Sequence, residues 1–199
     1  MKIGTKSLLF GVHQFLLHPL FVTLAWRALY REWPNRTELV AIFFHDWGYW
    51  GCPNIDGQEG KLHPERGAKM ASRWARRLGG DGDWSCALAL FHSREYAKRY
   101  GGGFPSLLCW PDKYSILLEP EWLYLMRARF SGEVREFKAH AIRKGQIPAD
   151  ASDRDWLRWY KQTVRSNLHI QALKHLCSKL PLSAYSVSRL SHSLRALTR

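Results

Sequence analysis

Residues Phe43–Gly48 read Phe-Phe-His-Asp-Trp-Gly, with an adjacent histidine and aspartate at the end of an apolar run that Gly48 closes. A charged aspartate rarely follows such a run unless a partner compensates for its burial, and a metal cation is the commonest partner of this kind. The doublet His45-Asp46 therefore indicates a buried metal site at the end of a helix.

Four more residues that can ligate a metal stand on either side of this doublet. His18 lies 27 residues before His45, His63 lies 18 after it, His92 follows 29 residues later and Asp112 another 20. His18 and His63 are each followed by a proline, which suits the first turn of a helix, so each is predicted at a helix start. Imidazole and carboxylate together favour Mn, Fe, Co, Ni, Zn or Mg over a thiolate site.

The order His…His-Asp…His…His…Asp resembles the HD-domain superfamily of metal-dependent phosphohydrolases, over about residues 8–120. Four histidines and two aspartates are too many donors for one ordinary ion with an open position, and the six-ligand branch of that superfamily implies two divalent transition-metal ions bridged by Asp46. Fe, Mn, Co or Ni are implied, with Mg or Zn as alternatives. In that layout one ion has the ligands His18, His45, Asp46 and Asp112, and the other has Asp46, His63 and His92.

His13 competes with His18 for the place of the first ligand, because both lie on the same apolar segment. The spacing of His18 and its position before Pro19 match the superfamily, so we assign the ligand to His18 and expect His13 to support the ligands or to be a satisfied core residue. The remaining histidines lack such partners and are predicted to be structural or at the surface: His140, His169, His175 and His192.

Basic side chains near the predicted ligands are candidates for holding substrate phosphates, with an ordinary solvated charged loop as the alternative. They are Arg94, Lys98, Arg99, Lys61 and Arg66. The candidate catalytic residues are the shared ligand Asp46, Glu65 as a proton shuttle, and Lys113 beside Asp112. Several aromatic residues are candidates for stacking on a base, or else fill the core and its rim: Trp47, Tyr49, Trp50, Tyr96 and Tyr100.

The composition predicts one globular domain over residues 1–199, with 46% hydrophobic residues and ten tryptophans. The four cysteines show no CxxC spacing, so free thiols in a reducing compartment are expected. The apolar run from Leu8 is interrupted by His13, Gln14, His18 and Pro19, which argues against a signal peptide or a membrane span. We therefore expect a cytoplasmic protein.

The sequence predicts an all-α fold, an HD-domain helical bundle with additional C-terminal helices, because no stretch alternates as a strand does. A metal-site core over about 8–120 is followed by a helical extension over 121–199. A loop is predicted from Gly48 to Gly60, and a basic, aromatic segment from Arg94 turns through glycines at 101–103. Helices are predicted at 7–17, 19–33, 36–46, from Pro64 to about Leu78, after a cap at Asp83, and at 106–118, 121–130, 132–144, 153–179 and 183–197.

The net charge of +13 favours anionic partners, such as a phosphorylated metabolite, a nucleic acid or a membrane surface, although a basic surface without a specific partner is an equal alternative. The resemblance implies a phosphodiesterase or nucleotidase that cleaves a phosphoester or phosphoanhydride of a nucleotide-like substrate through a metal-activated water. The stretch from His92 to Pro120 resembles bacterial HD-type diadenosine tetraphosphate hydrolases, whereas Ser93 departs from the HD-GYP phosphodiesterases. Alternatives are a diiron oxygenase of the myo-inositol-oxygenase kind and a basic nucleic-acid-binding protein or nuclease.

Overall fold

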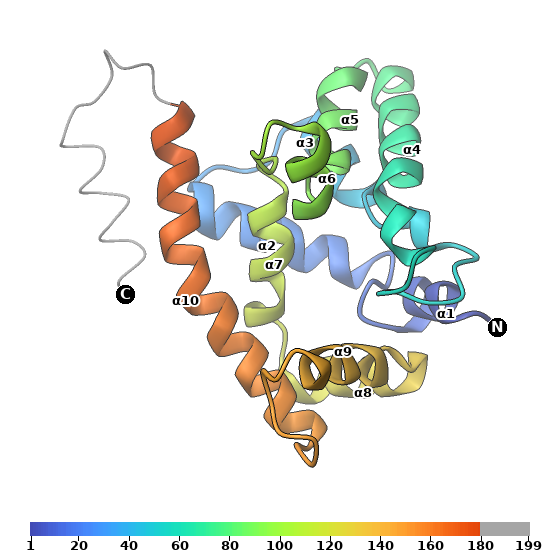
Figure 1. Cartoon of the computed structure of the whole chain (residues 1–199). Helices are drawn as coiled ribbons and strands as arrows, with labels where there is room; N and C mark the ends of the chain where they lie inside the picture. Colours follow the sequence, from blue (N-terminus) through green and yellow to red (C-terminus); the bar gives the residue numbers. More distant parts are fainter. Residues whose placement is uncertain (180–199) are drawn as a thin grey trace.

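A computed structural model describes residues 1–179, with side-chain detail as far as residue 167. Within residues 1–179 the chain forms only helices and turns, so the expected all-α fold is confirmed there (Figure 1). The predicted helix at 183–197 lies outside the described residues. The helices are α1 (Ile3–Phe10), α2 (Leu17–Tyr30), α3 (Arg36–Phe44), η1 (Trp47–Tyr49), η2 (Gly60–Leu62), α4 (His63–Arg77), α5 (Gly82–Leu90), α6 (Arg94–Tyr100), α7 (Cys109–Leu118), α8 (Glu121–Ser131), α9 (Glu133–Arg143) and α10 (Asp153–Lys179).

Two groups of helices face each other across the site. Helices α3, α4 and α5 pack on one another, and α2 packs on α7. Helices α8 and α9 form an antiparallel pair below them, and the long α10 runs along α7, α8 and α9 (Figure 1). One apolar cluster joins α2, α3 and α5 around Trp26, Ile42 and Leu88, and another joins α7 to α8, α9 and α10 around Trp110 and Leu157. None of the helices in residues 1–179 combines the length and the apolar character that a membrane crossing requires.

Helix starts follow the capping chemistry of the sequence. The Asn35 side chain accepts a hydrogen bond from the Glu38 backbone while the Glu38 side chain accepts one from Asn35, a capping box that confirms the predicted start of α3. The predicted cap at Asp83 is wrong. Asp81 caps α5, because its carboxylate accepts hydrogen bonds from the backbone nitrogens of Asp83 and Trp84.

Near the site the structure corrects the first predicted helix and adds detail to two other segments. The first helix is not at 7–17 but ends at Phe10, and residues 11–16 are a turn that carries His13. The buried residues of α3 are Val40, Ala41 and Ile42, whereas Leu39 is 44% exposed. The segment after Ser93 is a helix, α6, before the chain turns at the glycines.

Two glycines bring the end of α3 against the start of α4. A Cβ atom on Gly67 would lie 2.1 Å from the backbone oxygen of His45, and one on Gly48 would lie 1.9 Å from that of His63. A side chain at either position would force the two segments apart. This close approach places the His45-Asp46 doublet beside His63.

Candidate metal centre

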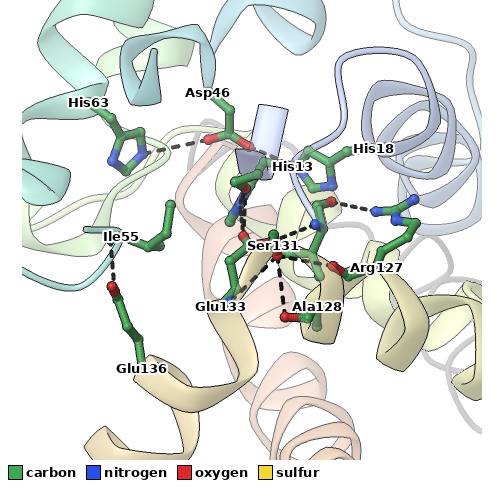
Figure 2. A network of polar contacts seen from close by, with 12 residues as sticks. His13, His18, Asp46, Ile55, His63, Arg127, Ala128, Ser131, Glu133 and Glu136 are labelled. Carbon is green, nitrogen blue, oxygen red and sulfur yellow. Dashed lines mark hydrogen bonds and ion pairs between the residues drawn. The ribbon is translucent and has the colours of Figure 1, made fainter. Parts of the chain in front are cut away.

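The structure brings together all six residues predicted as metal ligands, each at a helix end or in a first helical turn. His18 and Asp112 lie in the first turns of α2 and α7, and His63 is the first residue of α4. The doublet directly follows α3, and His92 follows α5. Their donor atoms form two groups that share Asp46, with His63 on one side of its carboxylate and His18 on the other (Figure 2).

The first group, the Asp112 pocket, consists of His18, His45, Asp46 and Asp112. The Nε2 atoms of His18 and His45 are 3.3 Å apart, and each lies 3.1 Å from Oδ2 of Asp46. Oδ1 of Asp112 lies 3.3 Å from Nε2 of His18 and 3.7 Å from Nε2 of His45. Donors bound about 2.1 Å from a common ion stand at such separations, so the four atoms can surround one cation.

The second group, the His63 pocket, consists of Asp46, His63 and His92. The Nε2 atoms of the two histidines are 3.2 Å apart, and Oδ1 of Asp46 lies 3.6 Å from the first and 3.8 Å from the second. The two oxygens of Asp46 thus face different donor groups. This arrangement can hold two cations with a bridging carboxylate.

Three of the imidazoles are oriented by a carbonyl three residues earlier on the same helix end. Nδ1 of His45 donates to the Ile42 carbonyl at 2.7 Å, Nδ1 of His63 donates to the Gly60 carbonyl at 2.7 Å, and Nδ1 of His92 donates to the carbonyl of Ala89. A histidine whose Nδ1 carries the donated proton presents the lone pair of Nε2 to a metal. All three Nε2 atoms point into the two pockets.

The Asp46 carboxylate shows that these residues fit a cation. Its Oδ2 atom is buried and accepts no hydrogen bond, although two imidazole nitrogens lie 3.1 Å away. A buried carboxylate oxygen without a hydrogen bond is costly unless a positive charge faces it. The donor set of imidazole nitrogens and carboxylate oxygens suits a divalent transition metal.

The two pockets differ in protonation. Burial opposes a charged imidazolium at His45, but the Asp46 carboxylate and contacts with Asp112 outweigh burial and raise the pKa of His45 to about 10. Burial and the charge of its neighbour His92 lower the pKa of His63 to about 3, and burial and the charge of His45 lower the pKa of His92 to about 4. The His63 pocket therefore offers neutral imidazoles across the physiological range, whereas in the metal-free protein His45 of the Asp112 pocket carries a proton on Nε2 that it must lose before this atom can bind an ion.

Lys113 contacts one of the ligands directly. Its Nζ atom donates to Oδ2 of Asp112 at 3.0 Å, while Oδ1 of the same carboxylate faces the Asp112 pocket. Burial would lower the pKa of the Lys113 ammonium, but the charge of Asp112 opposes burial and raises that pKa, so the lysine remains cationic. It fixes the orientation of Asp112 and adds a positive charge at the wall of the cavity described below.

A carboxylate–histidine pair that the sequence did not indicate stands beside the pockets. Glu133 is fully buried at the start of α9, and its Oε1 atom lies 2.8 Å from Nδ1 of His13 (Figure 2). Glu133 also accepts hydrogen bonds from the hydroxyls of Ser7 and Ser131 and from the backbone nitrogen of Val12. Burial opposes the ionised carboxylate, but the hydrogen bonds from these neighbours lower the pKa of Glu133. The ionised carboxylate fixes the His13 ring.

The His13 ring lies among the ligands without belonging to either donor group. It makes an edge-to-face contact with His18 at 5.6 Å between ring centroids and a tilted contact with Tyr49 at 4.8 Å, and Tyr49 stacks on His63 at 3.9 Å. Because its Nδ1 donates to Glu133, the Nε2 atom of His13 remains to exchange a proton within the cavity.

Both donor groups open into a cavity of about 630 Å³. Its other walls come from the end of α9 and one face of α10, which the sequence did not place near the metal ligands. Arg94 and Lys113 line this cavity, and so does His140, which was expected to be structural or at the surface. From α9, α10 and the connecting segment the lining includes Phe137, His140, Ala141, Lys144, Gln146, Trp156, Trp159, Tyr160, Thr163 and Asn167.

The other predicted phosphate-binding and proton-transfer residues are not among the cavity lining. Lys61, Lys98 and Arg99 are exposed, and Arg66 makes a 3.9 Å contact with Sγ of Cys52. Glu65 is exposed and accepts a hydrogen bond from the Tyr96 hydroxyl at 2.9 Å. The structure thus separates these residues from Arg94 and Lys113. The side chains of His169, His175 and His192 lie outside the part of the chain with described side chains.

An all-helical protein with a buried histidine–aspartate cluster is compatible with an HD-domain protein. Comparisons of the chain with protein-family models, with curated proteins and with solved structures find no match. What the chain itself establishes is an all-helical fold, over residues 1–179, with a buried cluster of histidines and aspartates that could hold metal ions.

Proposed function

We propose that this protein is a metal-dependent phosphohydrolase that cleaves a phosphoester or phosphoanhydride of a nucleotide-like substrate. The observation that carries the proposal is the position of Asp46, whose two oxygens face two separate donor groups. Two adjacent divalent ions bound there would supply Lewis acidity and lower the pKa of bound water, which favours in-line displacement at phosphorus.

His13 is the residue best placed to move a proton in this reaction. Its Nδ1 atom is held by Glu133 at 2.8 Å, and its ring lies against His18 and Tyr49 at the wall of the cavity. Although burial opposes the imidazolium, the charges of Asp46 and Glu133 raise the pKa of His13. A protonated Nε2 atom can therefore donate to the oxygen that leaves phosphorus, which typically contributes about 10²- to 10⁴-fold in rate.

Two basic side chains in the cavity support a phosphorylated substrate over a neutral polyol. Arg94 and Lys113 line the cavity on the side of Asp112, and the whole chain carries a net charge of +13. A guanidinium and an ammonium both bind phosphate oxygens well.

A metal analysis combined with an anaerobic substrate screen tests the proposal. We expect about two divalent ions per chain, and hydrolysis of at least one phosphorylated compound without oxygen when Mn or Co is supplied. The panel contains nucleotides, cyclic dinucleotides and single-stranded DNA. Turnover that needs both iron and oxygen would replace this proposal with an oxygenase, and steeply salt-dependent DNA binding without bound metal would replace it with a nucleic-acid-binding function.

A further inference from the structure

The cavity wall opposite the ligands is one face of α10. Five of its lining residues stand at helical spacing, so they share one side of the helix over a length of about 16 Å. They are Trp156, Trp159, Tyr160, Thr163 and Asn167. The donor groups thus form one end of the cavity, and this aromatic face with polar side chains beyond it forms a wall.

The aromatic rings on this wall are held in a fixed arrangement. Trp156 stacks on Phe137 at 5.7 Å with an interplanar angle of 15°, and Tyr160 stacks on Trp156 at 5.7 Å with an angle of 8°. Trp159 lies next to Tyr160 with ring centroids 6.2 Å apart. Trp156 is 3% exposed and serves the core, whereas Trp159 and Tyr160 are only partly buried. These two rings remain available to a ligand.

Arg94 and Lys113 line the same cavity as the aromatic rings, and Lys113 also contacts a predicted metal ligand. Lys113 contacts Asp112 at 3.0 Å. Helix α7 carries Lys113 and Asp112, and it packs on α10. Burial raises the pKa of the Tyr160 hydroxyl, and the charges of Lys113 and Arg94 oppose this rise because both cations lie close to the phenol. The cavity therefore presents metal donors, cations and aromatic rings.

We propose that Trp159 and Tyr160 form a subsite for the planar base of a nucleotide, whose phosphate Arg94 and Lys113 hold toward the two donor groups. The orientation of the nucleotide, with its phosphate toward the donor groups, rests on the proposed function. A base stacked on an aromatic side chain gains stability whatever its identity. Thr163, Asn167 and Gln146 supply polar groups for the base edge, and the cavity volume is that of a site for a single small molecule.

The test measures binding to the full-length, metal-free protein by calorimetry, so that it does not depend on turnover. The ligands are the 5′-monophosphates of adenosine, guanosine, cytidine and uridine, with ribose 5-phosphate as the base-free counterpart. At least one nucleotide should bind about tenfold more tightly than ribose 5-phosphate. Trp159→Leu should remove this difference without changing the affinity for ribose 5-phosphate, and Trp159→Phe should retain part of it.

Trp122→Leu is the matched control, because Trp122 is 68% exposed on α8 and does not line this cavity. It should leave all affinities unchanged. Arg94→Ala should lower the affinities for nucleotides and for ribose 5-phosphate by the same factor. Three results would overturn the subsite. The wild type could bind nucleotides and ribose 5-phosphate equally well, or it could bind neither. Trp159→Leu could also lose affinity for both kinds of ligand by the same factor. If the subsite fails but the protein hydrolyses a base-free phosphoester, the phosphohydrolase activity is still supported. If nucleotides bind through their base but none is hydrolysed, only the subsite is supported.

Discussion

The Asp112 pocket and the His63 pocket share Asp46 but differ in the number and charge of their donors. The first has two imidazoles and two carboxylate oxygens, and the second has two imidazoles and one carboxylate oxygen. An ion in the first pocket would be nearly neutralised and enclosed, whereas an ion in the second would retain more charge and more open positions. If both pockets bind metal, we expect the ion beside Asp112 to be held more tightly and the one beside His63 to be more exchangeable and more Lewis-acidic.

Removing the shared carboxylate should have the largest effect. Asp46→Asn takes a charged donor from both pockets at once, so we expect bound metal to fall from about two ions per chain toward none. Activity should fall by about 10³-fold or more, since losing even an outer partner of a ligand costs roughly 10- to 100-fold. Elemental analysis and a thermal melt check this, because added metal should no longer raise the melting temperature.

Asp56→Asn is the matched control for that variant. Asp56 lines the same cavity but belongs to neither donor group. It should keep about two ions. A loss of metal in Asp56→Asn equal to that in Asp46→Asn would show that the two pockets do not share a specific carboxylate.

Variants of single ligands should separate the two pockets. His18→Ala should empty the Asp112 pocket and His92→Ala the His63 pocket, leaving about one ion per chain in each variant. The ion that remains in His92→Ala should be the more tightly bound, because it retains four donors. Competition with a chelator measures the two affinities, and His140→Ala, which changes a cavity histidine outside both donor groups, is the control. Equal affinities in the two variants would remove the distinction drawn above.

His13 should affect turnover without affecting either pocket. His13→Asn is expected to keep both ions and to lower the turnover number by about 10²-fold, because it removes a proton donor and no ligand. Glu133→Gln should act in the same direction and also lower the free energy of unfolding, since Glu133 accepts four hydrogen bonds. The control is Glu136→Gln, one turn further along α9. Loss of metal in His13→Asn with full metal in His18→Ala would show that the ligands had been assigned to the wrong histidine.

Proton release on metal binding should show the smallest difference between the pockets. His45 has a pKa of about 10 and must lose a proton to bind an ion, whereas His63 and His92 have pKa values of about 3 and about 4 and are already neutral at pH 7. Filling the Asp112 pocket should release about one proton, and its affinity should rise about tenfold per pH unit, while the His63 pocket releases none. Calorimetry in buffers of different ionisation enthalpy counts these protons.

The same pKa values fix how the stability of the metal-free protein depends on pH. The pKa of His45 in the folded state lies above its unfolded value of about 6.5, so its stabilisation is present below about pH 6.5 and is lost as the pH rises toward 10. The lowered values of His63 and His92 destabilise the fold as the pH falls from about 6.5 to 4. Urea unfolding of the metal-free protein should therefore show greatest stability near pH 6 to 7.

The sequence predicted the helices from local patterns, and it predicted the six clustered residues from their resemblance to the ligands of the HD-domain superfamily. Helical periodicity and the proline after His18 or His63 place a side chain at a helix start without knowledge of the rest of the fold. Which of these helix ends meet was implied by the resemblance alone. That these residues bind metal and hydrolyse phosphate stays a prediction.

Glu133 could not be found in this way, because its role depends on contacts with residues more than 100 positions away. A glutamate in the first turn of a helix ordinarily interacts with solvent and the helix dipole. The structure shows how closely the two segments approach, because a Cβ atom on Gly11 would lie 2.1 Å from Oε2 of Glu133. Likewise, Trp156 and Tyr160 at a spacing of four residues look like core residues of an amphipathic helix, and only the packing of α10 shows a cavity beside them.

The pairing of His13 with Glu133 has a consequence for the order in which the protein matures. Glu133 is 120 positions from His13 and follows all six ligands in the chain, of which Asp112 is the last. Contacts of such long sequence separation form late, and synthesis proceeds from the N-terminus. We therefore expect the nascent chain to take up ions before α9 completes the proton-transfer pair. In refolding with cobalt, the absorbance of the bound ion should rise before the tryptophan fluorescence of α10 reaches its native value, and simultaneous changes would contradict this order.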